Sequence, residues 1–98
     1  MTLLTIGMDY DDTFTADPKL WSTFVENAKI AGHRVVLVTA RRDTEENNDD
    51  INAMLEHWDC QMPIVFSSLG SKLHAVDKRG IKVDIWIDDD PVKLVRGH

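Results

Sequence analysis

The sequence predicts an α/β protein, a Rossmann-like three-layer sandwich in which helices cover both faces of a central parallel sheet. Four short apolar runs rich in valine and isoleucine have the composition of buried strands. Segments with helical spacing lie between them, and such alternation is typical of right-handed βαβ units. The 98 residues suffice for one domain of this kind. We therefore expect a single domain over residues 1–98, with about four strands in the order 4-1-2-3.

The expected elements follow one another along the chain. The strands are residues 3–8, 34–38, 63–66 and 82–87. Asp17 and Pro18 are typical of a helix N-cap and first turn, and Gly32 of a helix end. The second helix carries apolar residues at 51, 54, 55 and 58, and the acidic run before it fits either its start or a loop. A third helix runs from about residue 71 to 79, and Pro91 opens a short last one.

Composition limits the classes of function. A formal net charge of -6 argues against broad binding of a nucleic-acid backbone, which needs a basic surface. Cys60 is the only cysteine in the sequence, so no internal disulfide is possible and a reducing, cytoplasmic compartment is expected. No run is long enough to span a bilayer, and the apolar start lacks the basic residues of a signal peptide. These features favour a cytoplasmic protein without a membrane partner.

Two acidic clusters each follow an apolar run. Asp9 and Asp11 come directly after the first strand, and Asp88 and Asp89 after the last. Charges at a strand end repel one another, so this pattern favours a cation between them, and Mg²⁺ prefers carboxylates together with waters and substrate phosphate. The second cluster has an alternative role as a helix cap before the last helix, for which Asp90 is the expected residue.

The other strands also end in polar residues. These are Thr39 after the second strand and Ser67 with Ser68 after the third. Ligands of parallel α/β folds bind at the carboxyl ends of the strands, near the point where the strand order reverses. All four strand ends therefore carry groups that can contact a metal ion or a phosphate.

These residues resemble the motifs of the haloacid dehalogenase (HAD) superfamily of phosphatases over nearly the whole chain. The first motif, Asp-x-Asp-x-Thr after a strand, matches residues 9–13. Thr39 matches the second, a Thr or Ser that closes the next strand. Lys72 matches the third, and Asp88 with Asp89 matches the fourth, an Asp pair after an apolar strand. The four motifs stand in the family's order.

The resemblance implies a mechanism. Asp9 would be the nucleophile that forms an aspartyl-phosphate, and Asp11 the general acid and then the general base. Mg²⁺ would be held by the Asp9 side chain, the Asp11 backbone carbonyl and Asp88, with Asp89 in support. The Thr39 hydroxyl would donate to a phosphate oxygen. Lys72 would add a positive charge to the same site.

Some assignments leave alternatives. Lys78 and Lys82 compete with Lys72 for the third motif, and we favour Lys72 because it stands at the start of its helix. Arg41 and Arg42 either bind a substrate phosphate bidentately or belong to a solvated loop.

The chain departs from the family pattern in size. No segment is long enough for a cap, so we expect a capless member with an open site suited to a large or flexible substrate. Residues 36–41 resemble the phosphatase half of polynucleotide kinase/phosphatases, although the acidic charge points away from nucleic acid. A fifth strand is expected to be absent, and the exposed sheet edge would favour a homodimer.

The primary hypothesis is a Mg²⁺-dependent phosphomonoester hydrolase acting on a phosphorylated small molecule, nucleic-acid end or protein. The alternative is a non-catalytic HAD-like module that binds a phosphorylated ligand or partner. A phosphotransferase stays open, because an acyl-phosphate can pass to an acceptor other than water. A two-component receiver domain fits poorly, since receivers place the phospho-acceptor Asp after the third strand, where this chain has Ser67 and Ser68.

Overall fold

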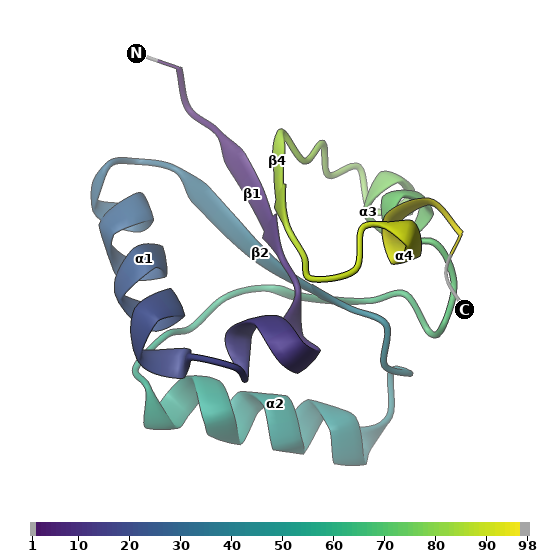
Figure 1. Ribbon diagram of the computed structural model, residues 1–98, viewed down its shortest axis with the longest axis horizontal. Coiled ribbons are helices and arrows are strands. Elements are labelled where there is room, and N and C mark those ends of the chain that lie inside the picture. The colour runs from purple at the N-terminus through teal and green to yellow at the C-terminus, as the bar shows by residue number, and fades with distance from the viewer. Residues whose placement is uncertain (1, 97–98) are drawn as a thin grey trace.

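The computed structural model describes residues 2–96, which form one four-stranded parallel sheet with helices packed against it (Figure 1). The strands lie in the order β3-β2-β1-β4. Their bounds are Thr5–Met8 for β1, Arg34–Thr39 for β2, Ile64–Phe66 for β3 and Ile85–Ile87 for β4. The expected order 4-1-2-3 is the same order taken from the other edge of the sheet. The prediction of an α/β protein with a four-stranded parallel sheet is therefore confirmed.

Three strands begin later than expected: β3 by one residue, at Ile64, and two others by more. The first was expected from residue 3 and begins at Thr5, and the last was expected from residue 82 and begins at Ile85. The carboxylate of Asp84 accepts the Thr5 N–H at 2.9 Å, and the Asp84 N–H donates to the Thr5 carbonyl at 2.8 Å. Because this side chain takes a place that a backbone carbonyl would fill, regular pairing starts only one residue later, at Ile85.

Three of the four helices begin with a side-chain cap. Their bounds are Pro18–Ile30 for α1, Glu45–His57 for α2, Lys72–Lys78 for α3 and Val92–Val95 for α4. Asp17, Thr44 and Ser71 each accept a backbone N–H three residues on, which satisfies one free donor of the first turn. The prediction that Asp90 caps the last helix is wrong, because the N-cap residue of α4 is Pro91. The Asp90 N–H instead donates to the Asp88 carboxylate at 2.9 Å.

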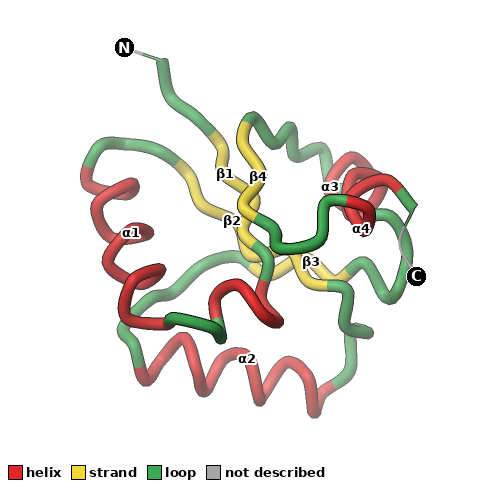
Figure 2. Tube along the Cα trace, viewed as in Figure 1, coloured by secondary structure: helices red, strands yellow, loops and turns green. Residues whose placement is uncertain are grey.

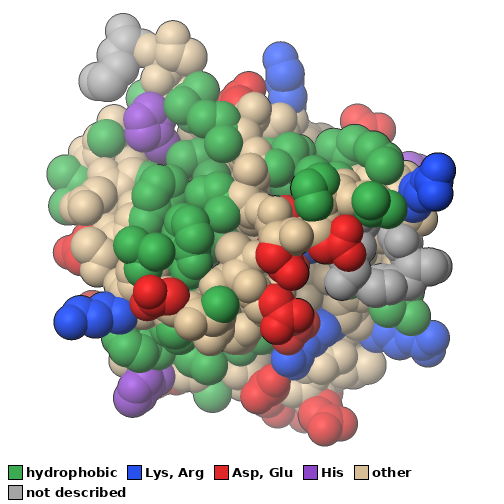
Figure 3. All heavy atoms as spheres, viewed as in Figure 1, with side chains coloured by type: hydrophobic (Ala, Val, Ile, Leu, Met, Phe, Trp, Pro, Cys, Tyr) green, Lys and Arg blue, Asp and Glu red, His purple; other side chains and the backbone are tan. Residues whose placement is uncertain are grey.

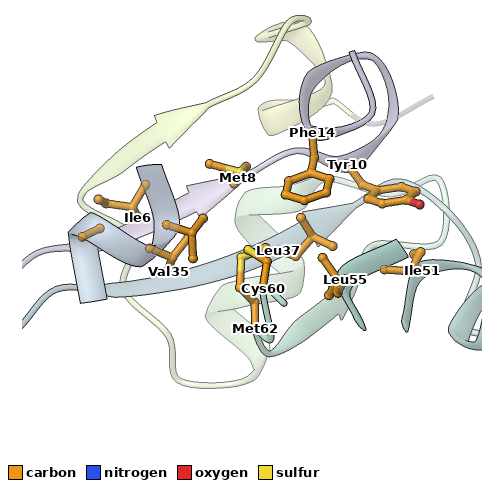
Figure 4. Close-up of a cluster of buried hydrophobic side chains, with 12 residues drawn as sticks. Ile6, Met8, Tyr10, Phe14, Val35, Leu37, Ile51, Leu55, Cys60 and Met62 are labelled. Carbon is orange, nitrogen blue, oxygen red and sulfur yellow. The ribbon is translucent and has the colours of Figure 1, made fainter. Parts of the chain in front are cut away.

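The sheet has a buried cluster of apolar side chains on each face. On one face, Ile6, Met8, Val35 and Leu37 pack with α1 and α2, as the close-up in Figure 4 shows for part of this cluster. On the other face, a smaller cluster joins β2 and β3 to α3. Its buried members are Val36, Val38, Val65 and Val76. Alternate residues of β2 thus face opposite layers, as the period of a strand requires.

Gly7 lets β4 pack closely against β1. It pairs with Trp86, and a Cβ atom at this position would lie 2.9 Å from the Trp86 ring and 3.0 Å from the Val83 side chain. Any larger residue would have to displace the indole. None of the helices in residues 2–96 has the length and apolar character that crossing a bilayer requires.

Candidate active site

The parallel sheet brings the predicted site residues to one edge. The loops after β1 and β4 run side by side (Figure 2), and the Asp9 N–H donates to the Ile87 carbonyl at 2.9 Å. Asp9 therefore continues the ladder of β1 beyond its last residue. Thr39 ends β2, and Asp88 follows β4 directly. Strands of similar register thus place these side chains along the carboxyl edge of the sheet.

A wide helical turn, η1 (Tyr10–Phe14), follows Asp9. The Phe14 N–H donates to the Asp9 carbonyl at 3.3 Å and the Thr15 N–H to the Tyr10 carbonyl at 3.1 Å, so each bond spans five residues. Asp12 adopts a φ of 63°, in the left-handed region that Asp tolerates better than most residues. This turn brings the hydroxyl of Thr13 back to the Asp9 carboxylate at 3.1 Å.

Lys72 is a buried cation between two carboxylates. Its Nζ atom lies 2.6 Å from Asp9 Oδ1 and 2.6 Å from Asp88 Oδ2, and the residue is 0% exposed. As the first residue of α3, it projects from the start of a helix capped by Ser71. Of the three lysines considered from the sequence, this one reaches the acidic cluster. A buried ammonium needs such partners, because its desolvation would otherwise be costly.

Burial dominates the electrostatics of Asp9. It raises the pKa of this carboxyl from its ordinary value to about 6, although the hydrogen bond from Lys72 acts in the opposite direction. The two oxygens have different partners, since Oδ1 accepts from Lys72 and Oδ2 from Thr13. The orientation of the carboxylate is thereby fixed on both sides.

Three carboxylates form a possible cation site. Oxygen atoms of Asp9, Asp88 and Asp89 all lie within 4.8 Å of one another. They are hard oxygen donors of the kind that Mg²⁺ prefers. The donor set therefore fits a magnesium ion. The Asp11 carboxylate lies outside this group, which leaves its backbone carbonyl as its predicted ligand atom.

Two of the residues predicted to bind phosphate, Thr39 and Lys72, are buried. Thr39 is 0% exposed, and its Oγ1 accepts the Arg41 N–H at 3.2 Å. Among residues 2–96 the Thr39 hydroxyl has no acceptor for its own proton, so that proton is available to a ligand. With Lys72 also inaccessible and Asp9 only 6% exposed, a phosphate can reach these groups only if a neighbouring side chain moves.

The Arg41 side chain engages Asp11 rather than solvent. Its Nε lies 3.0 Å from Asp11 Oδ2 and its Nη2 2.9 Å from Asp11 Oδ1, which makes a bidentate pair. Nη1 bonds to Asp50 at 2.7 Å and Asn47 at 3.4 Å, both in α2. The guanidinium carbon lies 5.1 Å from the centre of the Tyr10 ring. The hydrogen bond with Asp11 is the main reason that the pKa of Arg41 is raised even above its ordinary value.

Sequence reasoning did not identify this ion pair or the contribution of α2 to it. Arg41 and Asp11 are thirty residues apart in the sequence. Asp50 belongs to an acidic run that, from the sequence, fits either a helix start or a loop. No spacing in the sequence signals their contact. Arg42 has no contact with the acidic cluster among the interactions of residues 2–96, so the structure separates it from Arg41.

A loop ties the end of β3 to the Arg41 segment. The Ser67 N–H donates to the Thr39 carbonyl at 2.8 Å, Leu69 to Ala40 at 2.8 Å, and Ser68 to Arg41 at 3.2 Å. Ser68 and Leu69 both adopt left-handed backbone angles, with φ of 52° and 68°. The Ser67 hydroxyl is buried without a partner among the described residues. The third strand end thus supports the Thr39 loop, while no contact joins its side chains to the carboxylates.

A shallow pocket of about 320 Å³ adjoins the carboxylates. Figure 3 shows acidic side chains grouped on this face beside an apolar area. The lining residues are Asp12, Thr13, Ala16, Trp21, Ile87, Asp88 and Asp89. A second cavity, of about 390 Å³, lies between α3 and the segment before β4, among Leu73, Val76, Ile81 and Val83. Only the first touches residues of the candidate site.

Fold and site together define an α/β protein with a lysine-bridged acidic site at the carboxyl edge of a parallel sheet. Comparison of the chain with protein-family models, curated proteins and solved structures finds no match. The assignment of a function therefore depends on the residues of the site themselves.

Proposed function

We propose that this protein is a Mg²⁺-dependent phosphomonoester hydrolase, a capless member of the HAD superfamily that acts through an aspartyl-phosphate. The observation that carries the proposal is the buried Lys72, which bridges Asp9 and Asp88 at 2.6 Å each beside Asp89. The charged side chains of Lys72, Asp9 and Asp88 are each 8% exposed or less, and such burial is costly to a fold. Phosphoryl transfer, in contrast, requires a nucleophile, a cation and a metal within a few ångströms.

The chain's own residues would divide the reaction into two steps. The free oxygen lone pair of Asp9 attacks phosphorus, the ester bond breaks, and Asp11 gives its proton to the leaving alcohol. Asp11 then takes a proton from a water molecule, which attacks the aspartyl-phosphate and releases inorganic phosphate and free Asp9. The metal ion, when bound by Asp9, Asp88 and the Asp11 carbonyl with Asp89 in support, would neutralise charge on the phosphoryl oxygens. Thr39 and Lys72 would bind the remaining oxygens.

The proposal also covers partners and assembly. The substrate is a phosphorylated molecule, and the acidic charge disfavours extended contact with nucleic acid. The domain carries no cap, acts in the cytoplasm and has no membrane partner. A homodimer would form along β4, which is an edge strand with Ile85 44% exposed.

The test is hydrolysis of an aryl phosphate with Mg²⁺ or with excess chelator. We expect phosphate release with Mg²⁺ that is lost in Asp9→Asn and in chelator. Asp12→Asn is the matched control, because it removes one charge from the same turn at an exposed position that has no contact with Lys72. Turnover by Asp9→Asn equal to the wild type would contradict the nucleophile assignment.

Two observations favour a second candidate, a module that binds a phosphorylated ligand without turnover. In this arrangement Asp11 is held by Arg41, and the expected phosphate contacts are buried. Such a module would bind inorganic phosphate with Mg²⁺ while hydrolysing none of a panel of phosphomonoesters. Measurable turnover of any one of them, dependent on Asp9, would exclude it.

A further inference from the structure

We propose that Arg41 is a clamp that a phosphate ligand releases: it holds Asp11 in the free protein and exchanges this partner for phosphate oxygens. The inference deepens the function proposed above and rests on it. Its basis is the geometry around one guanidinium group, which presents two edges with different partners. It assigns to Arg41 the binding of phosphate oxygens in place of the Asp11 carboxylate.

The two edges of the guanidinium have different roles. The edge formed by Nε and Nη2 binds both oxygens of Asp11, at 3.0 and 2.9 Å. The opposite nitrogen, Nη1, is anchored to α2 through Asp50 at 2.7 Å. Loss of the Asp11 contact would therefore leave Arg41 attached to the protein. Its backbone N–H stays on Thr39 and its guanidinium stays over Tyr10.

The Nε and Nη2 edge suits phosphate as well as it suits a carboxylate. Two parallel N–H groups of arginine bind phosphate oxygens bidentately, and a phosphate dianion carries more charge than Asp11. The Arg41 N–H already bonds to Thr39, a predicted phosphate ligand, so the side chain starts from the loop beside the phosphate position. Exchange of one anion for the other keeps the guanidinium paired throughout.

Release of Asp11 is needed for the proposed chemistry. While both of its oxygens accept from Arg41, the Asp11 carboxylate is held in place and cannot turn toward a leaving group. The side chain of Asp11 is 49% exposed and that of Arg41 27%, whereas Thr39 and Lys72 are 0% exposed. A ligand from solvent can therefore reach the ion pair of Arg41 and Asp11 directly, whereas it cannot reach Thr39 and Lys72. Binding of phosphate to Arg41 and release of Asp11, the general acid, then occur in the same step.

The experiment compares two neighbouring charges. Calorimetry measures binding of inorganic phosphate in the presence of Mg²⁺ for the wild type, Asp11→Asn and Asp12→Asn. Both variants remove one negative charge from the same turn, but only Asp11 competes for Arg41. We expect Asp11→Asn to bind phosphate about tenfold more tightly than the wild type, and Asp12→Asn to differ by about twofold or less.

Asp11→Asn and Asp12→Asn are then compared in an Arg41→Gln background. This comparison distinguishes release of Arg41 from simple charge repulsion between Asp11 and phosphate. We expect phosphate affinity to fall in Arg41→Gln and the advantage of Asp11→Asn to shrink to that of Asp12→Asn. An equal gain from both substitutions, or a gain from Asp11→Asn that persists without Arg41, would overturn the clamp. Phosphate binding would then still support the proposed function.

A spectroscopic measurement tests the exchange directly. The Nε–H resonance of Arg41 is assigned by its loss in Arg41→Gln and followed by ¹⁵N NMR during a phosphate titration with Mg²⁺. We expect it to move with phosphate, and to differ between the wild type and Asp11→Asn before phosphate is added. An unchanged resonance at saturating phosphate would overturn the clamp. Absence of phosphate binding by the wild type would overturn the clamp and the proposed function together.

Discussion

Burial makes the charge of Asp9 costly to the folded state. Its pKa is raised to about 6, mainly by desolvation, so the folded protein holds this proton more tightly than the unfolded chain does. The associated stability is fully present below the unfolded pKa of 3.8 and is lost as the pH rises through about 6. The contribution of Asp9 to the stability of the metal-free protein should therefore decline as the pH rises from 3.8 to above 6.

Asp9→Asn tests this linkage, because the amide resembles the protonated acid in shape. In metal-free buffer we expect the substitution to raise the free energy of unfolding by about 2 kcal/mol at pH 8 and to change it little at pH 3.5. Urea unfolding at both pH values measures the difference, with Asp12→Asn as the exposed control. A loss of stability at pH 8 would mean that the contact with Lys72 outweighs the desolvation of Asp9.

Lys72 compensates the charges that the sheet edge concentrates. Lys72→Met would leave the carboxylates of Asp9 and Asp88 facing each other without a cation, and we expect a loss of about 3–5 kcal/mol at pH 7. Lys78→Met, at an exposed position of the same helix, should change stability by less than about 0.5 kcal/mol. Chemical denaturation of the three proteins makes the comparison.

Magnesium provides a second arm of the same experiment. Because a divalent ion can replace the missing positive charge, Mg²⁺ should recover part of the stability of Lys72→Met, or restore its folding if it is unfolded without metal. Equal stability of Lys72→Met and the wild type in chelator would show that the carboxylates do not depend on this lysine.

At the scale of elements, the contact of β1 with β4 depends on the absence of a side chain at Gly7. Gly7→Ala would put a Cβ atom 2.9 Å from the Trp86 ring, so we expect a loss of about 1–3 kcal/mol. The loss should shrink in a Trp86→Leu background, where the indole is gone. Thermal unfolding of the four proteins of this double-mutant cycle measures the coupling. Equal costs in both backgrounds would place the strain elsewhere.

Sequence patterns predicted the elements because each carries its own signal. The valine-rich β2 agrees with its apolar run to within one residue, and Asp17 caps α1 as its spacing predicts. The starts of β1 and β4 were wrong, since the Asp84 side chain replaces part of their pairing through a contact between residues distant in the sequence. The predicted last residues, Met8 and Ile87, are confirmed. Helix α2 begins at Glu45, which resolves the acidic run as the start of a helix.

The candidate site was likewise predictable from the sequence in part. Topology alone gathers Asp9, Thr39 and Asp88, because parallel strands end at one edge, and the start of a helix distinguishes Lys72 from its competitors. The bond of Arg41 to Asp11 could not be predicted, since it depends on the rotamers of two side chains, one from η1 and one from the loop after β2. Their roles in catalysis stay predictions until turnover is measured.

At the scale of the whole molecule, a net charge of -6 and the acidic site favour a divalent ion as a stabilising ligand. At a free Mg²⁺ concentration one hundred times Kd, linkage predicts a gain of about 2.7 kcal/mol, or a rise in Tm of about 10–20 °C for a domain of this size. Differential scanning calorimetry with Mg²⁺, against NaCl of equal ionic strength, measures it.

A variant distinguishes specific binding from general screening. Asp88→Asn should lose most of the magnesium effect while keeping any effect of NaCl, because Asp88 is one of the three clustered carboxylates. A rise in Tm that is the same with both salts would show that Mg²⁺ only screens the surface charge.

The loop at residues 67–70 limits where an additional segment could be inserted into this domain. Its three backbone hydrogen bonds to residues 39–41 join the two segments into one unit, so an insertion there would displace Thr39 and Arg41 as well. The exposed junction between η1 and α1, at Ala16 and Asp17, makes no backbone hydrogen bond to residues 39–41 within the described part of the chain. Ala16 also lines the pocket beside the carboxylates, so a segment inserted at this junction would begin next to them, which makes it the place to engineer substrate selectivity.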